Sequence, residues 1–146
     1  MADRIATTES AFNDSYVDAS YSPFNAGIDG LPSIKNLGNV VAWYGYYSVP
    51  IPLWVSFNGW GSGGRVNTEV IRKGTFAGKS RQIVIRPVTQ GGDSGAAYAN
   101  YNSDTGGWVL VGLHRVMLLV NGQPYESGGS AVDMVNSRTG TYPHLA

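Results

Sequence analysis

The sequence has 146 residues, with ten basic and ten acidic side chains, 20 glycines, two histidines and no cysteine. The absence of cysteine excludes a disulfide scaffold and a thiolate metal or redox site. Zero net charge and 14% charged residues, well below the usual ~25%, argue against nucleic-acid or membrane partners. The length fits one domain, and 42% hydrophobic residues argue against disorder.

The first twenty residues are acidic rather than apolar, with Asp3, Glu9, Asp14 and Asp18 among them. No apolar run approaches the ~20 residues that cross a bilayer. We therefore expect neither a signal peptide nor a transmembrane segment. The expectation is a soluble protein of open location, a virion included, that begins with a loose arm at 1–12.

Short β-branched and aromatic runs separated by Gly, Asn, Ser and Pro follow, a pattern typical of an all-β domain. Turn sequences such as Asn58-Gly59 and Asn121-Gly122 separate them. One short helix is predicted at 131–138, followed by a flexible tail at 139–146. The predicted strands are 16–20, 39–44, 53–57, 65–76, 82–87, 96–101, 108–120 and 123–125.

One predicted loop carries chemistry, the glycine-rich stretch Gly91-Gly92-Asp93-Ser94-Gly95. Glycines allow the backbone to bend sharply. The N–H groups of Gly92 and Ser94 can then point at one spot and stabilise an oxyanion. The loop makes Ser94 a candidate acyl-transfer nucleophile, and the alternative is a plain turn between two strands.

The sequence around Ser94 resembles the chymotrypsin-like serine peptidases of the compact bacterial and viral kind. The family's nucleophile loop is matched by Gly-Asp-Ser-Gly at 92–95, and its next strand by Trp-Val-Leu-Val-Gly-Leu-His at 108–114. Residues 55–66 are similar to the strand, glycine turn and returning strand that open its second barrel, and 129–135 to its closing strand and helix.

This resemblance covers about residues 50–137 and implies an all-β, chymotrypsin-like antiparallel barrel with a short C-terminal helix. It implies three regions: an N-terminal arm and remnant of a truncated first barrel at 1–50, a complete second barrel with the nucleophile loop at 51–138, and the tail at 139–146.

A further match lies earlier, in Val17-Asp18-Ala19, which resembles the family's strand bearing the triad aspartate. Such a carboxylate orients a histidine and stabilises its imidazolium; the alternative is a solvated turn residue or a helix cap. The family's catalytic histidine precedes this aspartate, and residues 1–17 contain none. Because a serine hydroxyl needs a base of pKa near 7, we expect the isolated chain to be inactive.

Both histidines, His114 and His144, follow Ser94. By resemblance, His114 and Arg115 line the primary substrate pocket, and in some family members a histidine there favours acidic side chains. The alternative is a half-buried strand histidine bonded to backbone. Residues 115–117, Arg-Val-Met, depart from the small residues usual beside that pocket. His144 is expected to be an exposed tail residue without a role.

Other side chains are expected to be structural. Lys73 and Lys79 fall in strand ends or turns, where lysine is ordinarily solvated, so a Ser–Lys dyad is not expected. The aromatic residues of 43–47, with Trp54 and Trp60, fit sheet packing, a carbohydrate platform or an interface patch. Two distant histidines and no acidic cluster predict no metal site, and no cofactor is expected.

Two functions remain open. In the first, the chain is a fragment or subunit of a trypsin-like serine endopeptidase that hydrolyses a peptide or protein substrate through Ser94. Asp18 would orient a histidine supplied by another segment or chain, and the Gly92 and Ser94 amides would bind the oxyanion. In the second, the chain is a catalytically inactive structural or binding module, for example a virion shell or decoration protein. In both, a second chain or identical copies would cover the truncated barrel.

Overall fold

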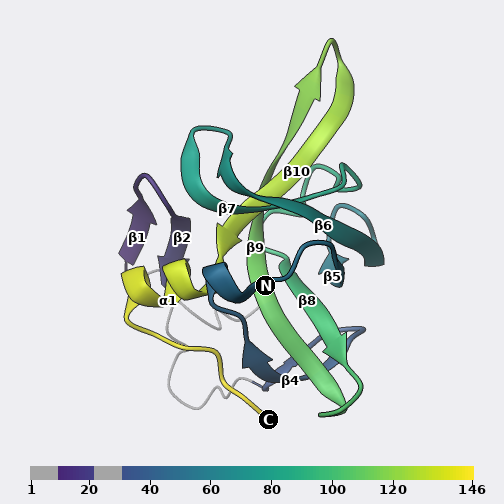
Figure 1. The fold of residues 1–146 in the computed structure, drawn as a ribbon, viewed down its shortest axis with the longest axis vertical. Helices are drawn as coiled ribbons and strands as arrows, with labels where there is room; N and C mark the ends of the chain where they lie inside the picture. Colours follow the sequence, from purple (N-terminus) through teal and green to yellow (C-terminus); the bar gives the residue numbers. More distant parts are fainter. Residues whose placement is uncertain (1–9, 22–30) are drawn as a thin grey trace, which may run out of the picture.

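The computed structural model describes residues 10–21 and 31–146, which form ten strands, one 3-10 turn and one helix (Figure 1). The all-β prediction is confirmed, because strands dominate and α1, the helix among the described residues, has eight residues. The elements are β1 (Ser10–Asn13), β2 (Asp18–Tyr21), β3 (Ser33–Ile34), β4 (Gly38–Trp43), η1 (Tyr46–Ser48), β5 (Leu53–Gly59), β6 (Gly64–Phe76), β7 (Lys79–Ile85), β8 (Ala97–Asn102), β9 (Gly107–Val120), β10 (Gln123–Ala131) and α1 (Val132–Thr139).

Six strands close into an antiparallel barrel. They pair in the order β10-β7-β6-β5-β8-β9, and β9 also pairs with β10, which closes the sheet. Closure removes free edges from the barrel. Outside it, β4 joins β9 in parallel and β3 pairs with β4. Strands β1 and β2 form a separate hairpin, which lies next to α1 at the left of Figure 1.

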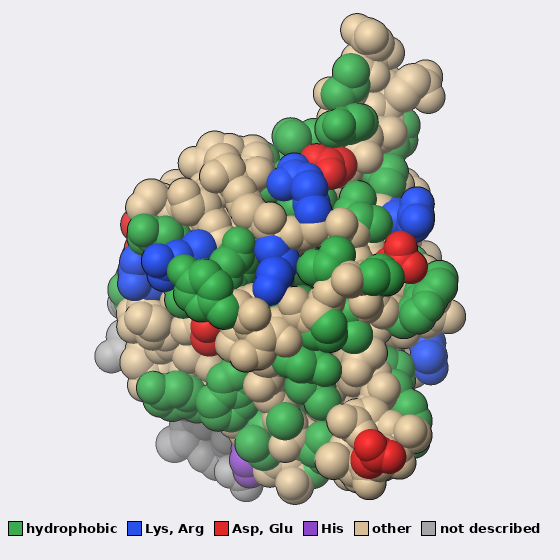
Figure 2. Space-filling view, viewed as in Figure 1, with side chains coloured by type: hydrophobic (Ala, Val, Ile, Leu, Met, Phe, Trp, Pro, Cys, Tyr) green, Lys and Arg blue, Asp and Glu red, His purple; other side chains and the backbone are tan. Residues whose placement is uncertain are grey.

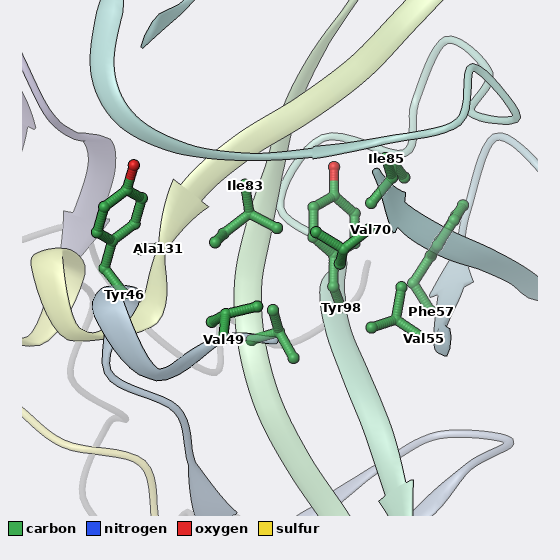
Figure 3. Close-up of a cluster of buried hydrophobic side chains, with 10 residues drawn as sticks. Tyr46, Val49, Val55, Phe57, Val70, Ile83, Ile85, Tyr98 and Ala131 are labelled. Carbon is green, nitrogen blue, oxygen red and sulfur yellow. The ribbon is translucent and has the colours of Figure 1, made fainter. Parts of the chain in front are cut away.

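The barrel is filled mainly by apolar side chains from its own strands, to which Tyr46 and Val49 of the η1 region are added (Figure 3). Phe57, Val70, Ile83, Ile85 and Tyr98 are fully buried. The rings of Phe57 and Tyr98 meet edge to face with their centroids 6.0 Å apart. Burial of each such side chain stabilises the fold by roughly 1.5–3 kcal/mol. The strands on either side of the Ser94 loop, β7 and β8, therefore share one hydrophobic core.

Two predicted boundaries differ from the structure. We expected a loose arm at 1–12, whereas residues 10–13 form β1 and pair with β2; residues 1–9 lie outside the described residues. We expected the last strand at 123–125, whereas β10 continues to Ala131. The continuation has little hydrophobic alternation of its own, but it pairs with both β7 and β9. Tertiary pairing thus overrides a weak local preference.

The C-terminal segment, expected to be a flexible tail at 139–146, packs against β4. Helix α1 ends at Thr139 and is capped by Gly140, whose backbone is left-handed with φ 68°. The chain then returns along β4, where the amide of Ala146 donates to the carbonyl of Val40 at 2.8 Å. The rings of Trp43 and Tyr142 lie 5.8 Å apart. These contacts give the segment a defined path along β4, although Tyr142 stays 68% exposed.

The surface carries few charges and one protruding hairpin. In Figure 2, basic and acidic side chains are scattered among polar and apolar ones. The tips of β9 and β10 extend beyond the barrel (Figures 1 and 2) and expose Leu119, Val120 and Tyr125. Over residues 10–21 and 31–146, no helix has the length and apolar character needed to cross a membrane.

Candidate active site

A cleft of about 520 Å³ separates the barrel from the hairpin of β1 and β2. Ser94 and Gly95 line it from the barrel, with His114 and Arg115 of β9, and Asp18 lines it from the hairpin. The two residues predicted for catalysis therefore face one space although they come from distant parts of the chain.

The Ser94 loop is held from inside by the carboxylate of Asp93, which is 1% exposed. Its Oδ1 accepts from the amide of Ser62 at 2.8 Å, and its Oδ2 accepts from the Ser62 hydroxyl at 2.5 Å and from the amide of Gln90 at 2.8 Å. Burial alone would raise the pKa of Asp93, but the hydrogen bonds from Ser62 and Gln90 outweigh it and lower that pKa. Asp93 is thus an ionised anchor directly beside Ser94.

Two glycines allow this close packing. A Cβ at Gly59, the last residue of β5, would overlap the Asp93 carboxylate. Gly92 has φ 96°, in the region that disfavours side chains. Glycine at these positions lets β5 approach the loop and lets the loop turn just before Ser94.

The hydrogen bonds within the loop leave the amides of Gly91, Gly92 and Ser94 without a backbone acceptor. The amide of Asp93 donates to Gln90 O at 3.1 Å, that of Gly95 to His114 O at 2.9 Å and that of Ala96 to Asp93 O at 3.0 Å. Among the described residues, none of these backbone bonds uses the N–H of Gly92 or Ser94. These two amides are the ones predicted for the oxyanion hole; Ser94 lines both the cleft and the smaller hollow beside it, whereas Gly92 lines that smaller hollow.

The hydroxyl of Ser94 is exposed, and it donates to the backbone carbonyl of Arg115 at 3.2 Å. A carbonyl oxygen does not take up a proton at neutral pH, so this contact orients the hydroxyl without activating it. Within the described part of the chain, no imidazole, carboxylate or amine is hydrogen-bonded to Ser94.

Asp18 follows a turn that Asp14 shapes. The Oδ1 atom of Asp14 accepts from the amides of Tyr16 at 2.8 Å and Val17 at 2.9 Å, an arrangement that favours a turn over a strand. The strand expected at 16–20 therefore begins only at Asp18. Val17 is completely buried, which places the exposed Asp18 at the lip of the cleft.

The turn before Asp18 is fastened to the rest of the molecule from several sides. The amide of Gln82 in β7 donates to Tyr16 O at 2.8 Å, and the ammonium of Lys79 donates to Asn13 Oδ1 at 2.6 Å. Arg138 in α1 donates from Nε to Asp14 Oδ2 at 2.6 Å. The hydrogen bond from the Tyr16 amide, followed by those from the Arg138 side chain and the Val17 amide, lowers the pKa of Asp14 to about 2.

His114 is buried and makes its bond inside the barrel. Its Nδ1 lies 2.5 Å from the hydroxyl of Tyr98. Burial lowers the pKa of His114 to about 4, an effect that the nearby charge of Asp93 only partly offsets. His114 is therefore neutral at pH 7 and is not bonded to Ser94. His144 is exposed on the segment that returns along β4.

Arg115 connects the cleft to a second, smaller hollow of about 240 Å³, between the Ser94 loop and β9. His114, Val116 and Met117 also line this hollow. The Nη2 of Arg115 donates to the backbone carbonyls of Phe76 at 2.8 Å and Ala77 at 3.2 Å. Burial lowers the pKa of Arg115, although the charge of Asp18 acts in the opposite direction.

The lysines considered for a dyad bond elsewhere. The ammonium of Lys73 donates to Tyr46 O at 3.0 Å, and that of Lys79 is bound to the hairpin turn. Neither contacts Ser94. Over the described ranges, no group of three His, Asp or Glu side chains is placed to hold a metal ion.

The barrel has the chymotrypsin-like fold. A solved structure of a glutamic-acid-specific serine protease, described as using a histidine triad in substrate binding, superposes with a TM-score of 0.75 over 96% of this chain and 74% of its own. The two sequences are 14% identical, so the similarity establishes the fold. No protein-family model and no curated protein sequence matches this chain.

Sequence reasoning missed the residues that support the site. Ser62 was treated as part of a glycine-rich turn, although its hydroxyl and amide hold Asp93. Asp14 was treated only as a charge, although an Asp two residues before Tyr16 is a turn signal by itself. The pairs Asp14–Arg138 and Tyr98–His114 join distant segments, and no local pattern indicates them.

Proposed function

We propose that this chain supplies the nucleophile and the aspartate of a chymotrypsin-type serine endopeptidase, and that the catalytic base comes from outside residues 1–146. The observation that carries the proposal is the exposed Ser94 hydroxyl, which shares a cleft with Asp18 and stands beside two amides without backbone acceptors. The base is an imidazole from another segment of a longer chain or from a second protein chain.

In the proposed reaction, Ser94 Oγ attacks the carbonyl carbon of a peptide bond while its proton passes to the imidazole. The oxygen that becomes negative accepts hydrogen bonds from the amides of Gly92 and Ser94. The imidazolium then protonates the leaving amine, and water cleaves the acyl-serine by the same steps. Asp18 holds the imidazole in orientation and stabilises its positive form.

The cleft has the space and the charge for an imported imidazole. Its volume of about 520 Å³ exceeds what one imidazole needs, so a side chain and a substrate segment both fit. Asp18 is exposed at the lip of the cleft. Its carboxylate can therefore accept a hydrogen bond from the imported imidazole without first breaking a bond to the barrel.

The substrate class that we propose to test first is a peptide with an acidic side chain before the scissile bond. His114 and Arg115 line both hollows beside Ser94, and the similar solved structure is that of a glutamic-acid-specific protease. Arg115 contributes the positive charge at neutral pH, because buried His114 is uncharged.

A second candidate function is an inactive binding module. The protruding β9–β10 hairpin favours it, since Leu119, Val120 and Tyr125 are each about half exposed at its tip, at 56%, 49% and 58%. Apolar side chains on an extended hairpin suit a protein interface. Under this function Ser94 is an ordinary surface serine.

The two functions are separated by labelling with a fluorophosphonate, with and without added imidazole as a substitute base. As a peptidase component, the chain gains one phosphonyl group on Ser94, faster with imidazole, and Ser94→Ala abolishes the adduct. The matched control is Ser103→Ala, an exposed serine in the turn after β8, which leaves labelling unchanged. A folded chain that stays unlabelled with imidazole present would contradict the peptidase proposal and favour the inactive module.

A further inference from the structure

The outer face of the barrel carries a further hollow, which shares no residue with the Ser94 cleft. It has a volume of about 400 Å³ and is formed by four neighbouring strands, β6, β5, β8 and β9. Its lining combines aromatic rings with amide, hydroxyl and guanidinium groups and contains no carboxylate.

Strand register places the aromatic residues in a row across this face. Ser56 of β5 pairs with Ala99 of β8 in antiparallel register. Extending this register brings Trp54, two residues before Ser56, opposite Tyr101, two residues after Ala99. Tyr101 in turn pairs with Trp108 of β9. Trp54 is 67% exposed and Tyr101 is 54% exposed, whereas Trp108 is 6% exposed. Trp54 and Tyr101 therefore form the rim and Trp108 forms the floor.

The floor is rigid. The ring of Tyr101 meets Trp108 edge to face with centroids 5.4 Å apart, and the guanidinium of Arg65 lies over the Trp108 ring at 5.1 Å. Such contacts restrict the rotamers of the side chains that make them. The rings of Tyr101 and Trp108 are thus held in place, and the more exposed Trp54 projects beside them at the rim.

The two amides of the hollow have defined orientations. Oδ1 of Asn67 accepts from the Ser56 hydroxyl at 2.6 Å and from Arg65 Nε at 3.0 Å. The NH₂ group of Asn67 therefore points away from Ser56 and Arg65 and is left as a donor. The NH₂ group of Asn100 donates to Trp54 O at 2.7 Å, which leaves its carbonyl oxygen as an acceptor. With the terminal nitrogens of Arg65, the hollow offers fixed donors and an acceptor beside exposed rings.

We propose that this hollow binds a pyranose unit of a neutral oligosaccharide. A pyranose presents C–H groups on one face, which pack on an aromatic ring, and hydroxyls at its edge, each able to donate and accept a hydrogen bond. Those needs match Trp54 and Tyr101 on one side and Asn67, Asn100 and Arg65 on the other. A wholly apolar ligand would leave the amides and the guanidinium desolvated and unpaired, which is costly.

The site would attach the chain to a glycan or a glycosylated protein, independently of any chemistry at Ser94. Calorimetric titration of the full chain with the hexasaccharides of cellulose, xylan, chitin and mannan tests it. We expect at least one of them to bind, and Trp54→Ala to weaken that binding about tenfold or more. The control is Trp60→Ala, since Trp60 is 91% exposed just beyond β5 but lies outside the hollow. Ser94→Ala should bind as the parent chain does.

Three results would overturn the proposal. One is the absence of binding to all four hexasaccharides by a chain that is folded by circular dichroism. Another is equal binding by the Trp54→Ala and parent chains. The third is binding of an acidic polysaccharide alone, lost at high salt, because that result would indicate an anion site at Arg65 instead of a stacking site.

Discussion

Ser94 stands on a closed barrel, whereas Asp18 stands on a two-stranded hairpin fastened to that barrel by its turn. The barrel strands β5, β8 and β9 have neighbours on both sides and a common core. The hairpin pairs only within itself among the described strands and is held by contacts of residues 13–17 with Lys79, Gln82 and Arg138.

This difference bears on how the proposed site works. An isolated two-stranded hairpin is marginally stable in water, so the position of Asp18 depends on how its turn is held: by side-chain contacts, by the backbone bond from the Ser80 amide to Ser15 O at 2.8 Å and by the buried Val17. The Ser94 loop depends on Asp93, which is buried within the barrel. Under the proposed function, this chain holds the whole nucleophile half, and the aspartate half is the one that a base-bearing segment would further stabilise.

The largest effect is expected from Asp93→Asn, which weakens the hydrogen bonds that hold the Ser94 loop on the barrel. The amide group cannot accept from the Ser62 and Gln90 donors as the carboxylate does, so buried donors lose their partner. We expect the free energy of unfolding to fall by about 3 kcal/mol and Ser94 labelling to be lost. Chemical denaturation measures the free energy of unfolding, and phosphonylation rates measure the labelling.

The control for Asp93→Asn is the milder Ser62→Ala, with about 1 kcal/mol lost. An unchanged labelling rate in Asp93→Asn would contradict the anchor role of Asp93.

An intermediate effect is expected from the titration of His114. Its pKa of about 4 in the folded chain lies below the ~6.5 of an unfolded histidine, so the unfolded chain binds the extra proton between these values. Stability therefore falls as the pH falls from about 6.5 to 4, by about 2 kcal/mol between pH 7 and pH 5. Denaturation at both pH values measures the change. His114→Gln should remove this part of the pH dependence, and an undiminished slope in that variant would refute the assignment.

The smallest effect on global stability is expected from Asp14→Ala, which loosens the hairpin alone. The variant loses the bonds to Tyr16, Val17 and Arg138. Amide hydrogen exchange should accelerate over residues 10–21 while β5, β8 and β9 keep their protection. Since the pKa of Asp14 is about 2, its contribution is present above about pH 4 and is lost as the pH falls through about 2. Faster exchange throughout the barrel would show that the two sides are not separable.

The sequence predicts the elements that follow from local patterns, and it does not predict those that depend on contacts between distant segments. Barrel strands such as β6 and β9, the helix at 131–138 and the Ser94 loop follow from local apolar runs and glycine-rich turns. The start of β2 at Asp18 and the end of β10 at Ala131 depend on a carboxylate–amide turn and on pairing with two distant strands. The burial of His114 against Tyr98 is likewise set by barrel closure and leaves no local signal.

The central claim is that the nucleophile half is complete, with the amides of Gly92 and Ser94 ready to receive an oxyanion. It is tested most directly by ¹H–¹⁵N NMR of the chain before and after phosphonylation of Ser94. The account predicts that both amide protons exchange freely in the unmodified chain and move strongly downfield in the adduct, whose phosphoryl oxygen accepts from them. Amides already protected in the unmodified chain, or unmoved in the adduct, would contradict it.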